Sequence, residues 1–232
     1  MQETIHGITP PAPCEHLPGR VSQMEVLIGP SSRDEYGARV REGWRRFGYM
    51  TFRPDCPSCR MCQSLRIRVD TFQPSKSQRR AWNTNAGRTH ITIGPPSMDA
   101  AKLDLFERFH RAQAERKGWP PPSDDGLDTF MTNPFATEEW CYFDGERLLG
   151  VGYVDVLPDG LSAIYFFHEP EARDRSLGTL NVLSIVEAAA IRELPFVYLG
   201  YYVEGCGSLE YKARFRPNEI LRPGAGWSSF AT

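Results

Sequence analysis

Residues 139–201 read EWCYFDGERLLGVGYVDVLPDGLSAIYFFHEPEARDRSLGTLNVLSIVEAAAIRELPFVYLGY. The turn signals Asp144-Gly145 and Pro158-Asp159-Gly160 divide the first half of this segment. Such turns between apolar runs are typical of antiparallel hairpins. The pattern therefore predicts a three-stranded meander, with strands at 139–143, 147–157 and 161–167.

The second half of the segment changes to helical spacing. A charged loop is followed by an apolar pattern of helical period at 176–192 and by a short apolar run at 196–201. Meander, loop, helix and strand follow one another in this order in the acetyltransferase-type acyl-transfer fold, whose loop offers backbone donors to an anionic substrate. The spacing Arg175-x-x-Gly178 matches the first half of that loop's signature. The alternative is an ordinary surface loop capped by Ser176.

The rest of the chain predicts further helices and strands around this core. We expect helices at 34–47, with Gly48 as cap, at 76–83, opened by a Ser75/Gln78 capping box, and at 97–117, between Ser97 and Gly118, and strands at 64–70 and 88–93. The fold class is therefore α+β: an acetyltransferase-like mixed sheet with flanking helices, plus a smaller N-terminal α+β region bearing the cysteine cluster. We place the two regions at 1–96 and 97–232.

Composition and charge limit the function classes. The chain has 232 residues, 41% of them hydrophobic, and no apolar run near the ~20 residues that cross a bilayer. No secretory signal is visible, so we expect a cytoplasmic protein without membrane partners. Residues 39–88 hold twelve Arg or Lys and three acidic residues, a local charge of +9, against −11 in the remainder. This asymmetry indicates either a polyanionic partner or a solvated basic face.

Three cysteines are spaced at intervals that suit a metal site. Cys56, Cys59 and Cys62 form two C-x-x-C steps, and Cys14 could supply a fourth ligand. Tetrahedral sulfur sites for zinc or an iron–sulfur cluster use such spacing. The alternative is four reduced thiols without metal.

The motifs of nucleotide hydrolysis, of the serine nucleophile elbow and of zinc proteases are all missing from the sequence. An enzyme of this composition would have to receive an already activated donor.

Several motifs in order along the chain carry a resemblance to a known family. They are residues 43–48 (GWRRFG), 52–62 (FRPDCPSCRMC), 77–80 (SQRR), 156–163 (VLPDGLSA), 175–178 (RSLG), 198–202 (YLGYY) and 211–217 (YKARFRP). Together they resemble the bacterial aspartate/glutamate leucyltransferases, which are relatives of the eukaryotic arginyl-tRNA–protein transferases. The resemblance extends from Cys14 to Trp227.

The resemblance implies transfer of leucine from Leu-tRNA to the α-amino group of proteins with N-terminal Asp or Glu, which creates an N-end-rule degradation signal. No cofactor is required for such a transfer, because an aminoacyl ester is already activated. The partners would be Leu-tRNA and proteins that begin with Asp or Glu. Alternatives are arginine transfer from Arg-tRNA to the same acceptors, a non-catalytic RNA-binding module, and an ordinary acetyl-coenzyme A transferase.

Candidate site residues follow from this expected reaction. Tyr201, Tyr202 and Glu204, which end the strand after the loop and helix, are the predicted catalytic residues: tyrosines as proton relays or oxyanion donors, Glu204 as proton acceptor. Lys76, Arg79 and Arg80 on the short helix, with Arg175 and Gly178 in the loop, are predicted to bind tRNA.

The acceptor's carboxylate needs cations that can read it. Lys212, Arg214 and Arg216 alternate along an expected extended segment and are predicted to bind the acceptor, with tRNA phosphate contact as the alternative. A metal at Cys14, Cys56, Cys59 and Cys62, which their spacing already allows, is also suggested by analogy with the eukaryotic relatives.

Overall fold

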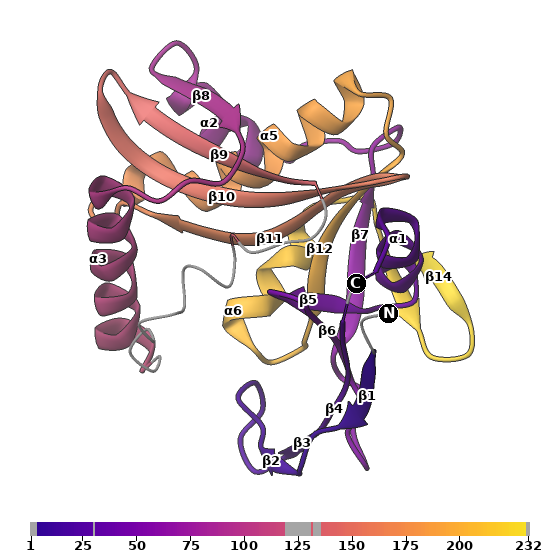
Figure 1. Cartoon of the computed structure of the whole chain (residues 1–232). Coiled ribbons are helices and arrows are strands. Elements are labelled where there is room, and N and C mark those ends of the chain that lie inside the picture. The colour runs from indigo at the N-terminus through magenta and orange to yellow at the C-terminus, as the bar shows by residue number, and fades with distance from the viewer. Residues whose placement is uncertain (1–3, 30, 119–130, 132–135, 231–232) are drawn as a thin grey trace.

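The large sheet forms the centre of the protein and is covered by helices (Figure 1). This computed structural model describes residues 4–29, 31–118, 131 and 136–230. Eight strands follow in the spatial order β14 (Gly226–Ser229), β13 (Asn218–Arg222), β7 (Gln63–Arg68), β12 (Phe196–Tyr202), β11 (Gly160–His168), β10 (Arg147–Leu157), β9 (Thr137–Asp144) and β8 (Thr89–Gly94). Neighbouring strands are antiparallel except β11 and β12, which run parallel. The sheet is therefore mixed, as predicted.

The predicted meander, helix and strand are confirmed. The two turn signals join β9 to β10 and β10 to β11, and the helix α5 (Leu177–Ile191) leads into β12. The short helix is α2 (Lys76–Asn85), and both hydrogen bonds of its Ser75/Gln78 capping box are present. β7 and β8 precede the expected boundary at residue 96 and yet belong to the large sheet, so residues from both predicted regions build it.

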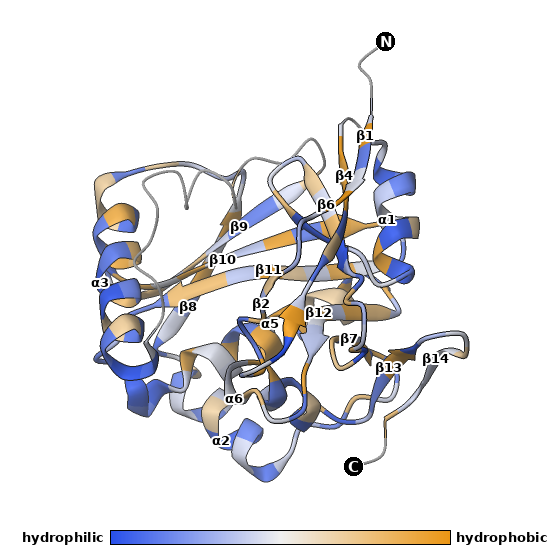
Figure 2. Cartoon of the chain, turned by 90° about the horizontal axis from the view of Figure 1, so that it is seen from below, coloured by the Kyte–Doolittle hydropathy of each residue, from blue (hydrophilic) through white to orange (hydrophobic). Residues whose placement is uncertain are grey.

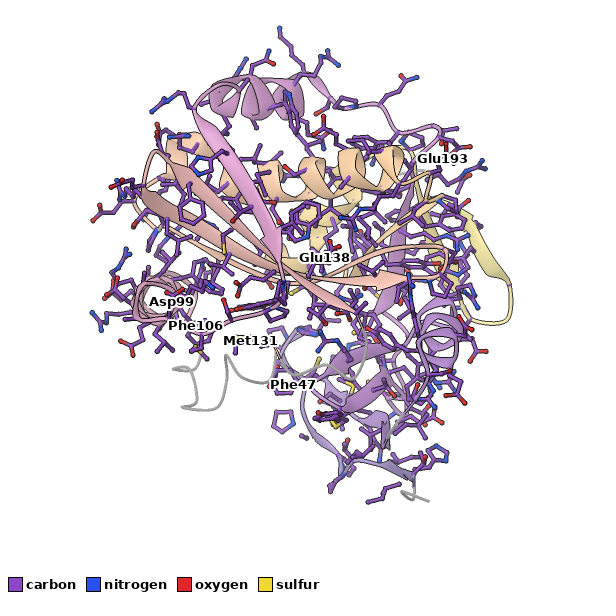
Figure 3. The ribbon with its side chains drawn as sticks, turned by 45° about the horizontal axis from the view of Figure 1, so that its top comes forward. Phe47, Asp99, Phe106, Met131, Glu138 and Glu193 are labelled. Carbon is purple, nitrogen blue, oxygen red and sulfur yellow. The ribbon has the colours of Figure 1, made fainter. Side chains whose placement is uncertain are left out.

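Helices cover both faces of the large sheet. In Figure 1, α5 and α2 lie above it, and their apolar side chains join β7, β11 and β12 in one core. On the opposite face α3 (Ala100–Lys117) packs Leu105, Phe106 and Phe109 against β10 and β11. The alternating colours of α3 in Figure 2 show that hydrophilic residues lie between its apolar ones. Figure 3 shows Phe106 beside Met131, which packs on the same cluster.

A smaller sheet from the N-terminal region lies beneath the large one (Figure 1). Its strand order is β1 (Ile5–Ile8), β4 (Met24–Ile28), β6 (Met50–Pro54) and β5 (Arg45–Phe47). A two-stranded ribbon, β2 (Ala12–Pro13) with β3 (Val21–Ser22), adjoins it. In Figure 3, Phe47 at the end of β5 lies on the side of this sheet nearer to α3. The remaining short elements are η1 (Arg173–Arg175), α6 (Gly207–Glu210) and η2 (Tyr211–Arg214).

The predicted helix 34–47 is wrong in its second half. Helix α1 spans Arg33–Arg41, and Gly43 then turns the chain with φ +90°. Residues 45–47 pair with β6 as β5, and Gly48 lies in the turn between the two strands instead of capping a helix. Of the apolar residues at helical spacing, Tyr36 and Val40 lie in the helix and pack against Leu157 and Tyr198, whereas Trp44 and Phe47 lie beyond its end. Strand pairing with β6 therefore overrides the local pattern.

The start of the helix predicted at 97–117 is also corrected. The N-cap is Asp99, whose carboxylate accepts a hydrogen bond from the Lys102 backbone N–H at 2.9 Å. Ser97 is engaged elsewhere, because its hydroxyl accepts a hydrogen bond from Lys102 Nζ at 2.7 Å. The predicted end is confirmed, since Gly118 adopts the left-handed conformation at the C-cap.

Candidate functional site

A cavity of about 1100 Å³ opens where two central strands separate. β11 and β12 pair over only three residues each, 160–162 with 196–198. Beyond this fork the two strands no longer pair, and the cavity is lined by residues 163–166 and 168 of β11 and by residues 199–201 of β12. The first turn of α5, one end of α3 and the smaller sheet complete its walls. The parallel pair therefore creates a site that lies between the two sheets.

One wall of the cavity is apolar. The smaller sheet contributes Met24 and Val26 from β4 and Met50 and Phe52 from β6. Leu199 of β12 faces the same space. Flexible methionines and branched side chains fit an aliphatic ligand of moderate size.

The cavity is also rich in positive charge. Its lining includes the cations Arg45, Arg116, Lys117, Arg173 and Lys212, and also Arg46, whose charge is balanced by buried Asp155. Among the described lining residues Glu15 is the only carboxylate. Opposite charges in a partly enclosed space attract each other strongly, so the site suits anionic ligands.

Of the three residues predicted for catalysis, the structure brings Tyr201 to the cavity. Its hydroxyl donates to the backbone carbonyl oxygens of Gly43 at 2.9 Å and Phe52 at 3.3 Å, and burial raises its pKa. Tyr202 points to the other face of β12, where its ring packs 5.0 Å from that of Phe230. Glu204 is exposed beyond the end of the strand. Neither Tyr202 nor Glu204 lines the cavity, and the catalytic roles of all three stay predictions.

The segment from 212 to 216 is not extended as predicted. Residues Tyr211–Arg214 form the 3-10 helix η2, so Lys212, Arg214 and Arg216 do not share one strand face. Lys212 lines the cavity, where its Nζ donates to the Tyr201 carbonyl oxygen at 2.9 Å. Burial and the positive charge of Arg45 lower the pKa of Lys212 to about 7. Arg214 and Arg216 are exposed outside the cavity.

The two outer arginines adjoin helix α2. Gln78 of α2 donates through Nε2 to the Arg214 carbonyl oxygen at 3.0 Å, and the Gln73 backbone N–H donates to the Arg216 carbonyl oxygen at 3.3 Å. Lys76, Arg79 and Arg80 on α2 are exposed. We call the set Lys76, Arg79, Arg80, Arg214 and Arg216 the basic surface. Lys212, which lines the cavity, lies two residues before Arg214 in the chain, so the basic surface adjoins the cavity along the backbone.

The two loop residues predicted to bind tRNA lie in different surroundings. Arg175 is buried; it pairs with Asp144 at 2.6 Å and donates to Asn85 Oδ1 and Thr89 Oγ1. It therefore ties the start of α5 to α2, β8 and β9. Gly178 lines the cavity in the first turn of α5, and an added Cβ would meet nothing within 4 Å. The N–H groups of a first helical turn have no upstream carbonyl partners, so this end can receive a negative group.

The cysteine cluster does not form a ligand set in this conformation. The Cys14 sulfur accepts a hydrogen bond from the Leu17 N–H, and the Cys56 thiol donates to the Gln23 carbonyl oxygen. Burial and the nearby thiols of Cys56, Cys14, Cys59 and Cys206 raise the pKa of the Cys62 thiol to about 12. Within residues 4–29, 31–118, 131 and 136–230, no three His, Cys, Asp or Glu side chains are arranged to hold a metal. A metal at Cys14, Cys56, Cys59 and Cys62 stays a prediction.

Sequence reasoning missed Arg45, which lies at the fork between β11 and β12. Its guanidinium donates to Ser162 Oγ at 2.7 Å and to the Ala163 carbonyl oxygen. The signals in the sequence were the motif at residues 43–48, which contains Arg45, and the high density of arginine between residues 39 and 88.

No helix in the described part of the chain is long and apolar enough to cross a membrane.

A solved structure supports the fold. The C-terminal domain of a protein described as a lysylphosphatidylglycerol synthetase from Agrobacterium fabrum superposes with a TM-score of 0.52 over 89% of this chain and 79% of that chain. The two sequences are 10% identical, so the likeness concerns the fold alone.

Comparisons of sequence identify the family. The family model for the C terminus of arginine-tRNA-protein transferase matches residues 101–222, and the model for its N terminus matches residues 12–80. The aspartate/glutamate leucyltransferase of Halorhodospira halophila is 37% identical over 92% of both chains. That of Marinobacter nauticus is 36% identical over 100% of this chain and 98% of its own. The chain therefore belongs to the arginine-tRNA–protein transferase family.

Proposed function

We propose that this protein is a cytoplasmic enzyme that transfers leucine from leucyl-tRNA to the α-amino group of proteins that begin with Asp or Glu. The product begins with leucine, which makes it a substrate of N-end-rule degradation. The names of relatives that match nearly the whole chain support this activity. The observation that carries it is the cavity, which combines an apolar wall with two cations at the fork, Arg45 and Lys212, that form no ion pair within the described residues.

The apolar wall favours leucine as the transferred residue. Met24, Val26, Met50 and Phe52 can surround an isobutyl side chain and exclude water from it. An arginyl side chain would need a carboxylate partner, and Glu15 is the one carboxylate of the described lining. The family description names arginine-tRNA, so arginine is the second candidate donor.

The basic surface is the proposed contact with the tRNA acceptor stem. Exposed Lys and Arg side chains neutralise phosphates without reading sequence. Because Arg214 and Arg216 lie outside the cavity beside α2, we propose that they bind phosphate, as do Lys76, Arg79 and Arg80. The cavity end of α5 at Gly178 would then receive the aminoacylated 3′ end, as the corresponding loop of an acetyltransferase-type fold receives its donor.

The chemistry requires little from the protein beyond orientation. The α-amine attacks the ester carbonyl carbon, a C–N bond forms, and the bond to the ribose oxygen breaks. The proton lost by the nitrogen ends on that ribose oxygen, so no cofactor takes part. Alignment of two bound reactants can supply most of the rate increase. Tyr201 acts here as a positioning residue, because its hydroxyl holds β12 against the carbonyl groups of Gly43 and Phe52.

A transfer assay tests the proposed function. The protein is incubated with Leu-tRNA or Arg-tRNA and with peptides that begin with Asp, Glu or Ala, and the products are weighed by mass spectrometry. We expect one leucine on the Asp and Glu peptides only. Addition of arginine would keep the class and change the donor. No addition by protein that binds tRNA would favour a non-catalytic RNA-binding module.

A further inference from the structure

Four cationic side chains are buried in the described part of the protein: Arg45, Arg46, Lys102 and Arg175. Three of them have a carboxylate partner at 2.6 Å, namely Asp155 for Arg46, Glu139 for Lys102 and Asp144 for Arg175. Arg45 forms no ion pair with a carboxylate of the described residues. A buried charge without a counter-charge is unfavourable, and folded proteins seldom keep one without a use. Arg45 is therefore the exception to explain.

The guanidinium of Arg45 is held in place at the fork. Two of its five N–H donors reach Ser162 and Ala163 on β11, which leaves the others for a ligand. On β12, Gly200 has φ +79°, and a Cβ there would approach the Arg45 Nε to 3.1 Å. The glycine thus makes room for the guanidinium between the two diverging strands. The result is a fixed, planar donor group that faces the cavity.

Lys212 is the second cation at this point of the cavity. Its ammonium interacts with the charge of Arg45, and its Nζ is anchored to the Tyr201 carbonyl oxygen. It also forms no ion pair with a carboxylate among the residues whose structure is described. Two neighbouring cations that form no ion pair within the described residues can together bind one anionic group.

We infer that the Arg45 guanidinium binds the side-chain carboxylate of the acceptor's N-terminal Asp or Glu, with Lys212 as its second cation. This inference rests on the proposed function and assigns a residue to its selectivity. A planar guanidinium matches a carboxylate with two parallel hydrogen bonds. Anchoring that carboxylate at the fork keeps the α-amine of the same residue close to the leucyl ester. The tRNA phosphates have the exposed basic surface instead, so they do not need this buried group.

The test compares two peptides that differ only in a neutral replacement of the carboxylate. One begins with Asp and the other with Asn, and kcat/KM is measured for each with Leu-tRNA. Arg45→Gln should lower the Asp-to-Asn ratio at least about thirtyfold, because a site built to bind a charge rejects its neutral analogue strongly. Arg45→Lys keeps the positive charge but loses the planar guanidinium, so its Asp-to-Asn ratio should lie between those of wild type and Arg45→Gln. The control is Arg68→Gln, an exposed arginine paired with Asp70 outside the cavity.

Leu-tRNA affinity and thermal stability are measured for every variant, so that misfolding is detected separately. We expect Leu-tRNA affinity to stay within about threefold of wild type in Arg45→Gln. An unchanged Asp-to-Asn ratio in a folded Arg45→Gln protein would overturn the inference, above all if Leu-tRNA affinity fell instead. A wild-type protein that transfers leucine to neither peptide would refute the proposed function itself.

Discussion

Arg45 and Arg46 are neighbours on β5, yet they serve two different regions of the molecule. Arg45 points to the cavity fork, where its hydrogen-bond partners among the described residues are one hydroxyl and one carbonyl oxygen. Arg46 binds both carboxylate oxygens of buried Asp155, at 2.6 and 2.7 Å. We call this second region, with Tyr36 and Thr137 also donating to Asp155, the Asp155 cluster. Adjacent side chains of a strand point in opposite directions, which separates the two roles.

The difference shows where the protein uses its buried charge for structure and where for binding. The Asp155 cluster joins α1 and β5 to β9 and β10, and so fixes the N-terminal region against the large sheet. At the fork, Arg45 is also a buried arginine, but no carboxylate within the described ranges balances its charge. Sites that bind substrate commonly sacrifice stability in this way.

The largest effect is expected from removal of Asp155. Asp155→Ala leaves Arg46 as a buried charge without its counter-ion, which should lower the free energy of unfolding by about 3–5 kcal/mol. Arg45→Met, at the adjacent residue, should lower it by only about 1 kcal/mol, because two hydrogen bonds are lost but no ion pair is broken and a buried charge is removed. Urea unfolding measures both. Equal losses in the two variants would contradict the distinction between the regions.

The basic surface should respond to salt, and the fork should not. Arg79→Ala combined with Arg80→Ala should weaken Leu-tRNA binding at least about tenfold at low salt and reduce the slope of log affinity against log salt by about 1.4 to 1.8. The Asp-to-Asn ratio should stay unchanged, since neither residue lines the cavity. Binding titrations at several salt concentrations provide the measurement. A changed ratio would show that phosphate binding and acceptor selection are not separate.

Much of the fold was predictable because its signals are local. The turns Asp144-Gly145 and Pro158-Asp159-Gly160 placed the meander, and the Ser75/Gln78 pair placed the start of α2. The end of α1 was not predictable, because the strand at 45–47 exists only through pairing with β6. Local spacing carries no information about that partner.

The candidate site was predictable only in part. Lys212 was found through its charge and its position in a basic segment, and it lines the cavity. Arg45 could not be told from eleven other cations between residues 39 and 88. What distinguishes it from Arg46 is the location of Asp155 and Ser162, more than 100 residues away in the chain. Burial and pairing of this kind are tertiary properties.

The pH dependence of acceptor binding distinguishes the two cations at the fork. Lys212, whose pKa is about 7, is charged below that pH and neutral above it, whereas Arg45 stays charged. His16 and Cys206 are the other titratable groups that interact with Lys212, and burial lowers the pKa of His16. The KM for an Asp peptide should rise up to about tenfold from pH 6 to pH 8.5, since one of two cations is lost. In Lys212→Met the KM should be high at every pH. The α-amine of the peptide titrates equally for both proteins, so the ratio of the wild-type KM to the Lys212→Met KM at each pH reports Lys212 alone.

The smallest effect concerns the stability cost of Lys212. Its pKa in the folded protein lies below the ordinary value of 10.5, so unfolding takes up a proton between about pH 7 and pH 10.5. The resulting destabilisation is complete below pH 7 and disappears as the pH approaches 10.5. Lys212→Met should therefore be more stable than wild type by about 1 kcal/mol at pH 7, and this gain should shrink toward pH 10. Urea unfolding of both proteins at the two pH values measures it. A variant less stable than wild type at pH 7 would show that the hydrogen bond to Tyr201 outweighs the buried charge, and that this part of the fork is structural like the Asp155 cluster.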